Sequence, residues 1–437
     1  MYCGIDLGTT NSLIGSGDKL WTGLVSSSVD VERKCQVERE NVSDNVVSSY
    51  KVNMTTGDSG KLPIACSSVI LRTLADLATR ASGQTVTDVV VSVPAKFTHT
   101  QRQAVVQATE NAGLTMRGLI NEPTAAAIYV CHDVKDLLIV YDLGGGTFDV
   151  TVIDSRAGNY YVVATEGRIL AGDDFDNALV ERAYKDCKVQ IRYRAGVTRK
   201  KFTSRVRLAK EAIQKSGMPQ YIDMAEFGYD GMWELTPEMY QEVMKNVFAE
   251  TIKLTNHLVG CYLSETESPK IVFVGGSTAC PYLRKWVTEE TGLQEMPCST
   301  MPDLIVAKGV ALYAEMLENG TAQNEVDDIT KRLCVEDDKG MTFTVVEKNS
   351  TIPTEASVTV ANPTRADVLE INLYQGDSII ASENDYIGTL RYEYGEIKEA
   401  NEGWVDIKVS IDRSGLITLE GEDLLTMERQ SIKLVMR

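Results

Sequence analysis

Two segments of the chain share a pattern that suits phosphate chemistry: an aspartate ends an apolar run and is followed by glycine and threonine. The segments are GIDLGTTNS, with Asp6, and YDLGGGTFDV, with Asp142. Glycines let the backbone approach a phosphate, and successive N–H groups form an anion-binding nest. Two facing carboxylates suit Mg²⁺, which prefers oxygen ligands and keeps several of its waters. The pair therefore predicts that phosphate and Mg²⁺ bind between two related halves.

A third glycine turn, VGGST at Val274–Thr278, also follows an apolar run and precedes a helical pattern. A helix N-terminus in this position can bind an anionic or ribose group. One such turn alone is ordinary, but three in order favour a nucleotide site. The chain has neither GxxxxGK[ST] nor a GxGxxG that opens a βαβ unit, which excludes a Walker-type loop and the dinucleotide fingerprint.

The elements that must hold these turns change in character near residue 320. Before it, apolar runs at strand spacing alternate with helical patterns, for example strands over 86–93 and 135–142 and helices over 67–82 and 236–263. Residues 22–60 are weakly patterned. After it, short alternating runs separated by turn residues predict an all-β sandwich.

Composition and charge exclude several classes. The 437 residues are 43% hydrophobic and 24% charged, enough for packed cores, and the net charge is −18, of which residues 321–437 carry −11. Such a chain repels a nucleic-acid backbone. No run approaches the roughly 18 apolar residues of a membrane helix, and nine scattered cysteines without CxxC pairs argue against disulfides or zinc. We expect a cytoplasmic monomer that binds neither nucleic acid nor membranes.

With these motifs in place, the sequence resembles the DnaK-type heat-shock chaperone family, within the actin and sugar-kinase superfamily. The matching segments run in family order over most of the chain: GIDLGTTNS, VVVSVPAKFTHTQRQA, AGLTMRGLINEPTAAA, YDLGGGTFDVTV, AGDDFDNAL, VFVGGSTACPYL, PDLIVAKGVAL, EKNSTIPT, LYQGDS and VSIDRSGLITLEGED. The resemblance implies an α/β actin-like ATPase domain of duplicated ribonuclease-H-like halves (1–320, lobes 1–135 and 136–320). A linker (321–332) and a β-sandwich (333–437) without a helical lid would follow.

The resemblance also implies roles for individual residues. Asp6 and Asp142 would hold the Mg²⁺ waters. The implied catalytic group is Lys51, Glu122, Asp142, Thr147 and Asp149. The implied nucleotide contacts are Gly8, Thr9, Thr10, Asn11, Gly145, Gly146, Gly172, Lys210, Gly275, Gly276, Ser277 and Asp303. The assignment of Lys51 rests on the position of NVVSSYK, and an ordinary surface lysine is the alternative.

Several positions depart from the family pattern. Ala279 stands where the family usually has an arginine against the adenine, and Arg207 where it usually has a glutamate. Residues 13–66 are shorter than in the family, and the segment Asn324–Leu333 lacks its apolar linker run. The implied peptide-binding residues are Val335, Asp337, Asp338 and Val360. The acidic loop with Asp337 and Asp338 is either a solvated turn or a groove that prefers basic segments.

These observations predict an ATP-dependent, chaperone-like protein that slowly hydrolyses ATP with Mg²⁺ and binds extended polypeptide, with co-chaperones as further partners. The alternative is a nucleotide-binding scaffold with weak or no ATPase that docks one dedicated partner. A small-molecule kinase of the same superfamily is disfavoured, because it would carry a second α/β domain in place of the sandwich.

Overall fold

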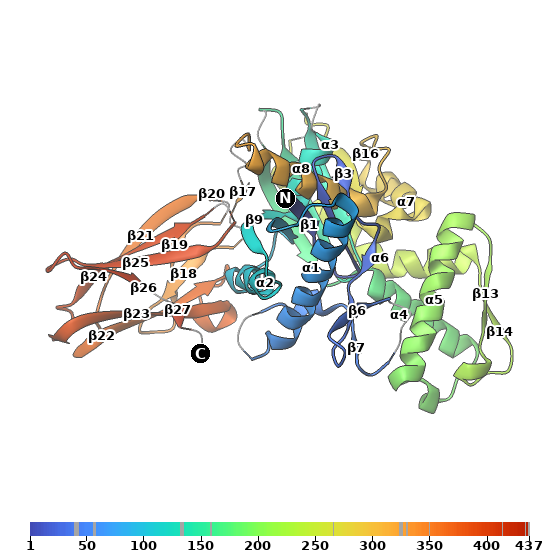
Figure 1. Cartoon of the computed structure of the whole chain (residues 1–437), viewed down its shortest axis with the longest axis horizontal. Coiled ribbons are helices and arrows are strands. Elements are labelled where there is room, and N and C mark those ends of the chain that lie inside the picture. The colour runs from blue at the N-terminus through green and yellow to red at the C-terminus, as the bar shows by residue number, and fades with distance from the viewer. Residues whose placement is uncertain are drawn as a thin grey trace.

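The structure is a computed structural model that describes residues 1–38, 43–55, 58–131, 135–157, 160–264, 266–322, 327–328, 331–348, 350–412, 414–432 and 434–435. It consists of an α/β part and a β-sandwich that extends from one side of it (Figure 1). Half of the linker proposed at 321–332 (residues 323–326 and 329–330), and His132, lie outside the described residues.

Two mixed sheets in the α/β part repeat one strand order. The first is β3-β2-β1-β8-β9, with β4 also on β2, and the second is β12-β11-β10-β15-β16. In each, an antiparallel hairpin is followed by two parallel strands. The strands are β1 (Tyr2–Asp6), β2 (Asn11–Ser16), β3 (Lys19–Leu20), β4 (Val25–Ser26), β8 (Asp88–Val93), β9 (Thr115–Asn121), β10 (Leu137–Leu143), β11 (Phe148–Asp154), β12 (Tyr161–Arg168), β15 (Lys270–Val274) and β16 (Gln294–Glu295). The repeated order agrees with the duplication inferred from the two Asp-Gly-Thr motifs.

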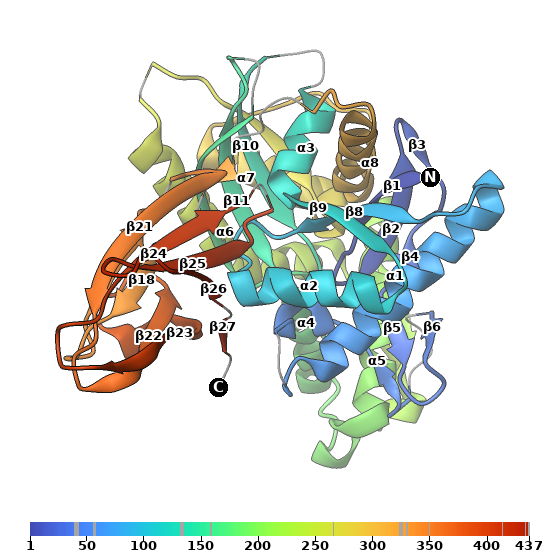
Figure 2. The same ribbon diagram turned by 60° about the vertical axis from the view of Figure 1, so that its left-hand side comes forward.

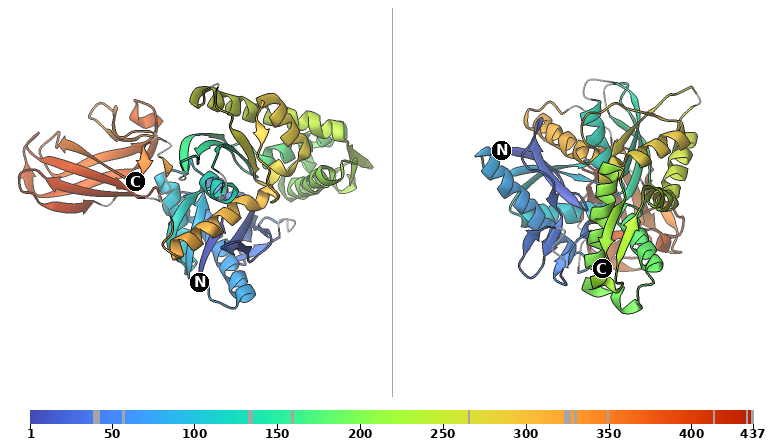
Figure 3. Two further views of the ribbon diagram at one scale, coloured as in Figure 1. Left: turned by 90° about the horizontal axis from the view of Figure 1, so that it is seen from above. Right: turned by 90° about the vertical axis from the view of Figure 1, so that its right-hand side faces the viewer.

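Within the described residues, eight α-helices cover these sheets. They are α1 (Lys61–Ser82), α2 (His99–Asn111), α3 (Glu122–Val130), α4 (Gly172–Asp186), α5 (Gly196–Ser216), α6 (Pro237–Tyr262), α7 (Pro281–Thr291) and α8 (Ile305–Glu318). Seen from above, the blue and green halves meet with α8 between them (Figure 3). Helices α3 and α8 touch so closely that a Cβ on Gly309 would lie 1.8 Å from the carbonyl oxygen of Ala125. The two halves therefore share a core of their own between the two sheets.

The weakly patterned residues 22–60 form small elements. The strands β5 (Ser28–Asp30), β6 (Cys35–Val37) and β7 (Val46–Val47) make a three-stranded sheet, and the 3₁₀ turn Tyr50–Asn53 follows. A second small hairpin joins β13 (Gln220–Asp223) to β14 (Met232–Leu235). Short strands of two or three residues give too little alternation for sequence periodicity to detect.

The sandwich has two antiparallel sheets around one apolar core. One sheet is β19 (Thr342–Val346), β18 (Leu333–Glu336), β22 (Ala366–Gln375), β23 (Asp385–Lys398) and β27 (Leu434–Val435), and the other is β21 (Thr354–Ala361), β24 (Trp404–Ile411), β25 (Ile417–Asp423) and β26 (Arg429–Ile432). A short pair, β17 (Asp327–Asp328) and β20 (Thr351–Ile352), lies at the junction with the α/β part. Burial alternates along β24, as expected for a sheet with one face on the core.

The sandwich is joined to α2 by specific hydrogen bonds, and Figure 2 shows both elements side by side. The Arg102 guanidinium donates to the Ser414 carbonyl at 3.0 Å, and the Ser414 hydroxyl accepts from the Leu119 N–H at 3.0 Å. The Ile417 N–H donates to Nδ1 of His99 at 3.0 Å. Because Arg102 and His99 are buried, this contact is a packed interface between the two parts.

Helix α1 corrects one expectation from the sequence. By length and composition it could cross a membrane, but half of its most apolar window is buried inside the protein. Its apolar face packs in the core of the first half with Ile70, Leu71 and Leu74. One such helix is weak evidence for a membrane span, because core helices pass the same test.

We expect the interface histidine to make stability depend on pH. Burial and the nearby Arg102 lower the pKa of His99 to about 4. The unfolded chain, with a histidine pKa near 6.5, therefore binds more protons between these values, and stability falls as pH falls. The wild type should lose about 2 kcal/mol of unfolding free energy between pH 7.5 and pH 5 from this residue, as measured by urea unfolding.

The matched control is His99→Asn, whose side-chain oxygen can accept from the Ile417 N–H but does not titrate. Its unfolding free energy should change less between the two pH values. An equal pH dependence in both proteins would contradict the assignment.

Candidate functional site

The glycine turns of the two halves open onto one cleft of about 340 Å³. It lies where β1 and β10 end, and its lining comes from both halves and from the turn after β15. Two contacts join the halves near the cleft: the Ser49 hydroxyl donates to Asp173 at 2.7 Å, and Lys96 pairs with Glu166 at 3.1 Å. These contacts join positions 124 and 70 residues apart in the sequence.

The floor of the cleft carries carboxylates around one buried lysine. Nζ of Lys51 lies 2.6 Å from Oε1 of Glu122, and the lysine side chain is only 4% exposed. The surface-lysine alternative for Lys51 is therefore wrong. Asp6 and Asp142 line the same floor, and the buried Ser92 hydroxyl donates to Oδ1 of Asp6 at 2.7 Å.

This crowding raises the pKa values of the carboxyl groups. Burial, then repulsion by Glu122, raises the pKa of Asp6 to about 6, although Lys51 and Ser92 oppose the shift. The same two causes raise the pKa of Asp149 to about 7 and that of Asp142 well above its usual range. More negative charge is thus buried here than the nearby lysines neutralise, and this arrangement favours a bound cation.

The two Asp-Gly-Thr turns form the walls above this floor. In the first, the Gly8 N–H donates to the Ser12 hydroxyl at 3.1 Å, and the Gly8 carbonyl accepts from Ser27 at 2.8 Å. In the second, the Gly144 N–H donates to the Thr147 carbonyl at 3.1 Å. Oγ1 of Thr10 is buried with no hydrogen-bond partner among the described residues. The turns are therefore closed by their own bonds, while a hydroxyl between them is left for a ligand oxygen.

The far end of the cleft is built by α4, α5 and the turn after β15. The Ser277 hydroxyl donates to the Gly144 carbonyl at 2.8 Å, which ties the third glycine turn to the second. On α5, Lys210 and Arg207 each contact Asp176 of α4 at 2.6 Å, and Arg207 also reaches Asp173 at 3.2 Å.

This end also contains one unpaired acceptor. Oδ1 of Asp303 is buried without a hydrogen-bond partner in the described part of the chain. Ala279 lines the wall and offers no charge or ring to a ligand. The wall therefore combines a free acceptor with small side chains, which fits a flat polar group such as a nucleobase.

The cleft brings together most of the predicted residues. Its lining includes Asp6, Gly8, Thr9, Thr10, Asn11, Lys51, Glu122, Asp142, Gly145, Thr147, Gly172, Lys210, Gly275, Gly276, Ser277 and Asp303. Gly146 is buried and, like Asp149, is absent from the lining. Asp149 instead stands opposite Asp142 in the β10–β11 pair.

Sequence reasoning missed Ser92, Asp173, Asp176 and Gln214. Ser92 lies in the apolar strand β8, and no motif around it indicates a functional role. Asp173 and Asp176 belong to the AGDDFDNAL segment, where two acidic side chains near a helix start could have drawn attention.

Comparison of the sequence with models of known protein families shows which family the chain belongs to. The model described as Hsp70 protein matches residues 19–436. The chain belongs to the Hsp70 family. Hsp70 proteins are chaperone-type nucleotide-binding proteins that bind ATP or ADP, typically with Mg²⁺, and combine an actin-like ATPase domain with a β-sandwich. The repeated sheets, the cleft and the sandwich are the parts that this membership requires.

The acidic loop of this Hsp70 sandwich is an ordered turn. Oδ1 of Asp337 accepts from the N–H groups of Lys339 and Met341 at 2.9 and 2.7 Å. Asp338 is exposed, whereas Val335 is buried in the sandwich core and Val360 packs partly against it. The side chain of Val335 therefore does not face a surface groove, and of the two acids only Asp338 is free to meet a partner.

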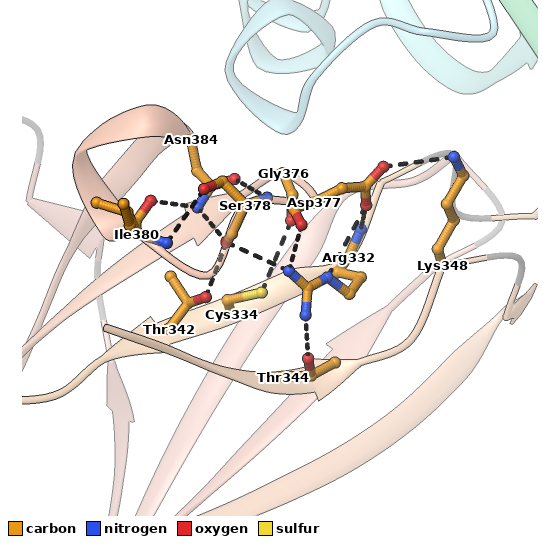
Figure 4. Close-up of polar contacts among 10 residues, drawn as sticks. All are labelled: Arg332, Cys334, Thr342, Thr344, Lys348, Gly376, Asp377, Ser378, Ile380 and Asn384. Atoms are coloured by element: carbon orange, nitrogen blue, oxygen red, sulfur yellow. Dashed lines mark hydrogen bonds and ion pairs between the residues drawn. The ribbon is translucent and has the colours of Figure 1, made fainter. Parts of the chain in front are cut away.

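A polar network holds the neighbouring segment 376–384 beside this loop (Figure 4). The Arg332 guanidinium donates to the carbonyls of Asp377 and Ser378 at 2.7 and 3.2 Å and to the Thr344 hydroxyl at 3.0 Å. The Asn384 amide adds bonds to the carbonyls of Ser378 and Ile380. A β-bridge between Met341 and Ile380 joins the loop directly to this segment.

We expect the third glycine turn to tolerate alanine at one of its two glycines only. Gly275 has φ of 85°, and a Cβ there would lie 2.5 Å from the Leu143 carbonyl oxygen and 2.8 Å from Oδ1 of Asp142. Gly275→Ala should therefore lower the free energy of unfolding by about 3 kcal/mol. Urea unfolding followed by circular dichroism measures the change.

The adjacent Gly276→Ala is the matched control, since no atom lies within 4 Å of its Cβ position. It should change the unfolding free energy by no more than about 0.5 kcal/mol. Equal effects at both positions would show that the turn does not have this geometry.

Proposed function

We propose that this protein hydrolyses ATP with Mg²⁺ and uses the reaction to control polypeptide binding by its sandwich. The supporting observation is the buried Lys51–Glu122 pair, which lies among carboxylates on the floor between two Gly-Thr turns. Phosphoryl transfer to water depends on positioning and charge neutralisation, and this floor offers both.

The donor set fits Mg²⁺ held through water. No group of three His, Cys, Asp or Glu side chains is arranged to ligate a metal directly within the described residues. Asp6 and Asp142 have raised pKa values and face the cleft, so they would bind the waters of the ion. A bound Mg²⁺ would neutralise phosphate charge, and its charge would lower the pKa values of these carboxyl groups.

The protein's own groups have separable tasks. The N–H groups of the turns at Gly8–Asn11 and Gly144–Thr147 would bind the β- and γ-phosphates. Lys51, oriented by Glu122 at 2.6 Å, would hold the attacking water against the γ-phosphate. Asp149, whose pKa lies near 7, is a candidate to take up a proton from that water.

A chain of buried contacts would couple the cleft to the sandwich. Arg102 donates to the Ser414 carbonyl of the sandwich and to Oδ1 of Asn121 at 2.7 Å. Asn121 directly precedes Glu122, which pairs with Lys51. A shift of Glu122 during the ATP cycle would therefore change the contacts of Arg102 with the sandwich. Movement of the sandwich would likewise change the position of Glu122 in the cleft.

Loss of the floor carboxylate or of the turn hydroxyl should stop hydrolysis. We expect Asp142→Asn and Thr147→Ala each to lower kcat for phosphate release by at least about 100-fold, because stabilising groups near the γ-phosphate are lost. The control is Asp58→Asn, on the surface at 95% exposure. Turnover like the wild type in both cleft variants would refute the mechanism.

A nucleotide-binding scaffold is the second candidate, and two observations favour it. Ala279 gives a nucleobase no stacking partner, and Arg207 is engaged by Asp173 and Asp176. Losing a cation–π contact typically costs about 1 kcal/mol, so nucleotide affinity would be modest. In this reading the sandwich docks a dedicated partner without coupling to hydrolysis.

Calorimetry distinguishes the two candidates. In the chaperone reading, ATP with Mg²⁺ should change the affinity for extended peptides by a factor between about 5 and 150, and peptide should change ATP affinity by the same factor. Arg102→Met should bring this factor toward one, because it removes the link between Ser414 and Asn121. The exposed Arg117→Met serves as its control. A factor of one in the wild type would favour the scaffold.

A further inference from the structure

The second sheet of the sandwich presents an outer face with two kinds of side chain. On β24 the outward residues are Trp404, Asp406 and Lys408, while Val405, Ile407 and Val409 point into the core. On β25 the outward residues are Glu420 and Glu422, which stand beside Lys408 and Asp406 in the β24–β25 pair. We call this surface the outer face; it contains a depression of about 340 Å³.

One end of the outer face is apolar and exposed. The turn between β25 and β26 carries Leu424, Leu425 and Met427, which are 45%, 69% and 64% exposed, and Trp404 beside it is 46% exposed. The Leu424 N–H donates to the Trp404 carbonyl at 3.0 Å, which joins the turn to β24. Four large apolar side chains thus form one patch, which we call the apolar end.

The turn that carries the apolar end is rigid. Oδ1 of the buried Asp423 accepts from the N–H groups of Leu425 and Thr426 at 2.7 and 3.0 Å, and the Met427 N–H donates to the Asp423 carbonyl at 2.8 Å. Met427 has φ of 61°, a conformation that side chains other than glycine and asparagine adopt at a cost. A methionine held there in solvent gains nothing from the fold itself, which points to a role in binding.

The apolar end is also free of the α/β part. Residue Ile417, at the start of β25, bonds to His99, and β25 then runs for seven residues to Asp423. At a rise of about 3.3 Å per residue, the turn lies roughly 20 Å from that interface. In Figure 1 the strands β24 and β25 extend away from the helices, so a partner can reach the face.

The rest of the outer face has an excess of negative charge. Lys408 pairs with Glu355 at 2.8 Å and Arg429 with Glu422 at 3.1 Å. The Asp406 carboxylate accepts from the Thr359 hydroxyl, and the Glu420 side chain lies opposite Lys408 without a hydrogen bond or close ion pair of its own to a described residue. Two carboxylates therefore remain to attract a cationic group, beside the apolar end.

We propose that the outer face binds an extended polypeptide segment with an apolar residue followed by basic residues two and four positions later. The outward positions 420 and 422 of β25 and position 424, directly after the strand, are spaced by two residues, which is also the spacing of side chains on one side of an extended peptide. A peptide aligned with β25 would place its apolar side chain on the apolar end and its cations near Asp406 and Glu420. This surface is separate from the loop that contains Asp337 and Asp338.

The test uses the full chain and three fluorescein-labelled nonapeptides in fluorescence anisotropy. The first carries one leucine with lysines at positions +2 and +4 and serine elsewhere. The second has the same composition with lysines at +1 and +3, so that leucine and lysines point to opposite sides. The third has glutamates in place of the lysines. The first should bind most tightly, and added salt should weaken it.

Two variants of the outer face test the location. Leu425→Ser/Met427→Asn should weaken binding of the first peptide by about tenfold. Its melting temperature should not fall, because asparagine tolerates the backbone at 427. Glu420→Lys should weaken binding roughly fivefold. The control is Ile379→Ser, which removes an equally exposed apolar side chain, at 61%, from segment 376–384 and should leave affinity unchanged.

Several outcomes overturn the proposal. Binding that the outer-face variants leave unchanged would locate the peptide elsewhere, and equal binding of the acidic peptide would refute the role of charge. Failure of all three peptides to bind would also refute it. A dimer in sedimentation velocity that Leu425→Ser/Met427→Asn abolishes, without peptide binding, would assign the face to a second copy of the chain.

Discussion

The ion pair between Lys51 and Glu122 is the interaction on which the cleft depends. It is buried on a floor that also holds Asp6 and Asp142, and burial together with repulsion by Glu122 raises the pKa values of these two carboxyl groups. An apolar floor would be more stable, since burying charge costs more than surface pairing returns. A cation that arrives with a ligand would stabilise the charged form of these buried carboxyl groups.

The duplicated sheets supply the geometry for this floor. Each half has an aspartate at the last or next-to-last position of its first long strand, and the same strand order places both strand ends at the shared cleft. Helices α3 and α8 pack at backbone distance through Gly309 where the two halves meet. Small residues at such contacts matter because an extra methyl group would separate the halves and the carboxylates with them.

The sandwich makes direct contacts with the part of the chain that forms the cleft. Arg102 contacts the sandwich at Ser414 and the first half at Asn121, next to Glu122. The same sandwich carries ordered surfaces at two places: the loop held by Asp337 and Arg332, and the outer face with its apolar end. Order at exposed positions costs conformational entropy, and a surface that is already ordered would not incur that cost again on meeting a partner.

Much of this could be predicted from the sequence because the signals are local. The Asp-Gly-Thr turns, the strands over 86–93 and 135–142, and the change to short alternating runs after residue 320 depend on residue type and spacing within a few positions. Structure moves these boundaries by only a few residues, with β8 at Asp88–Val93 and β10 at Leu137–Leu143. The family resemblance, which the Hsp70 match confirms, rests on the same motifs.

Tertiary structure alone decided the features that depend on distant parts of the chain. Burial of Lys51 arises from a 3₁₀ turn within a weakly patterned segment, and its partner is 71 residues away. The bond from Ser92 to Asp6, the neutral His99 at the interface and the engagement of Arg207 by two aspartates have no local signature either. A motif determines which groups are available, but charge state and burial follow from which groups the fold brings within a few ångströms of each other.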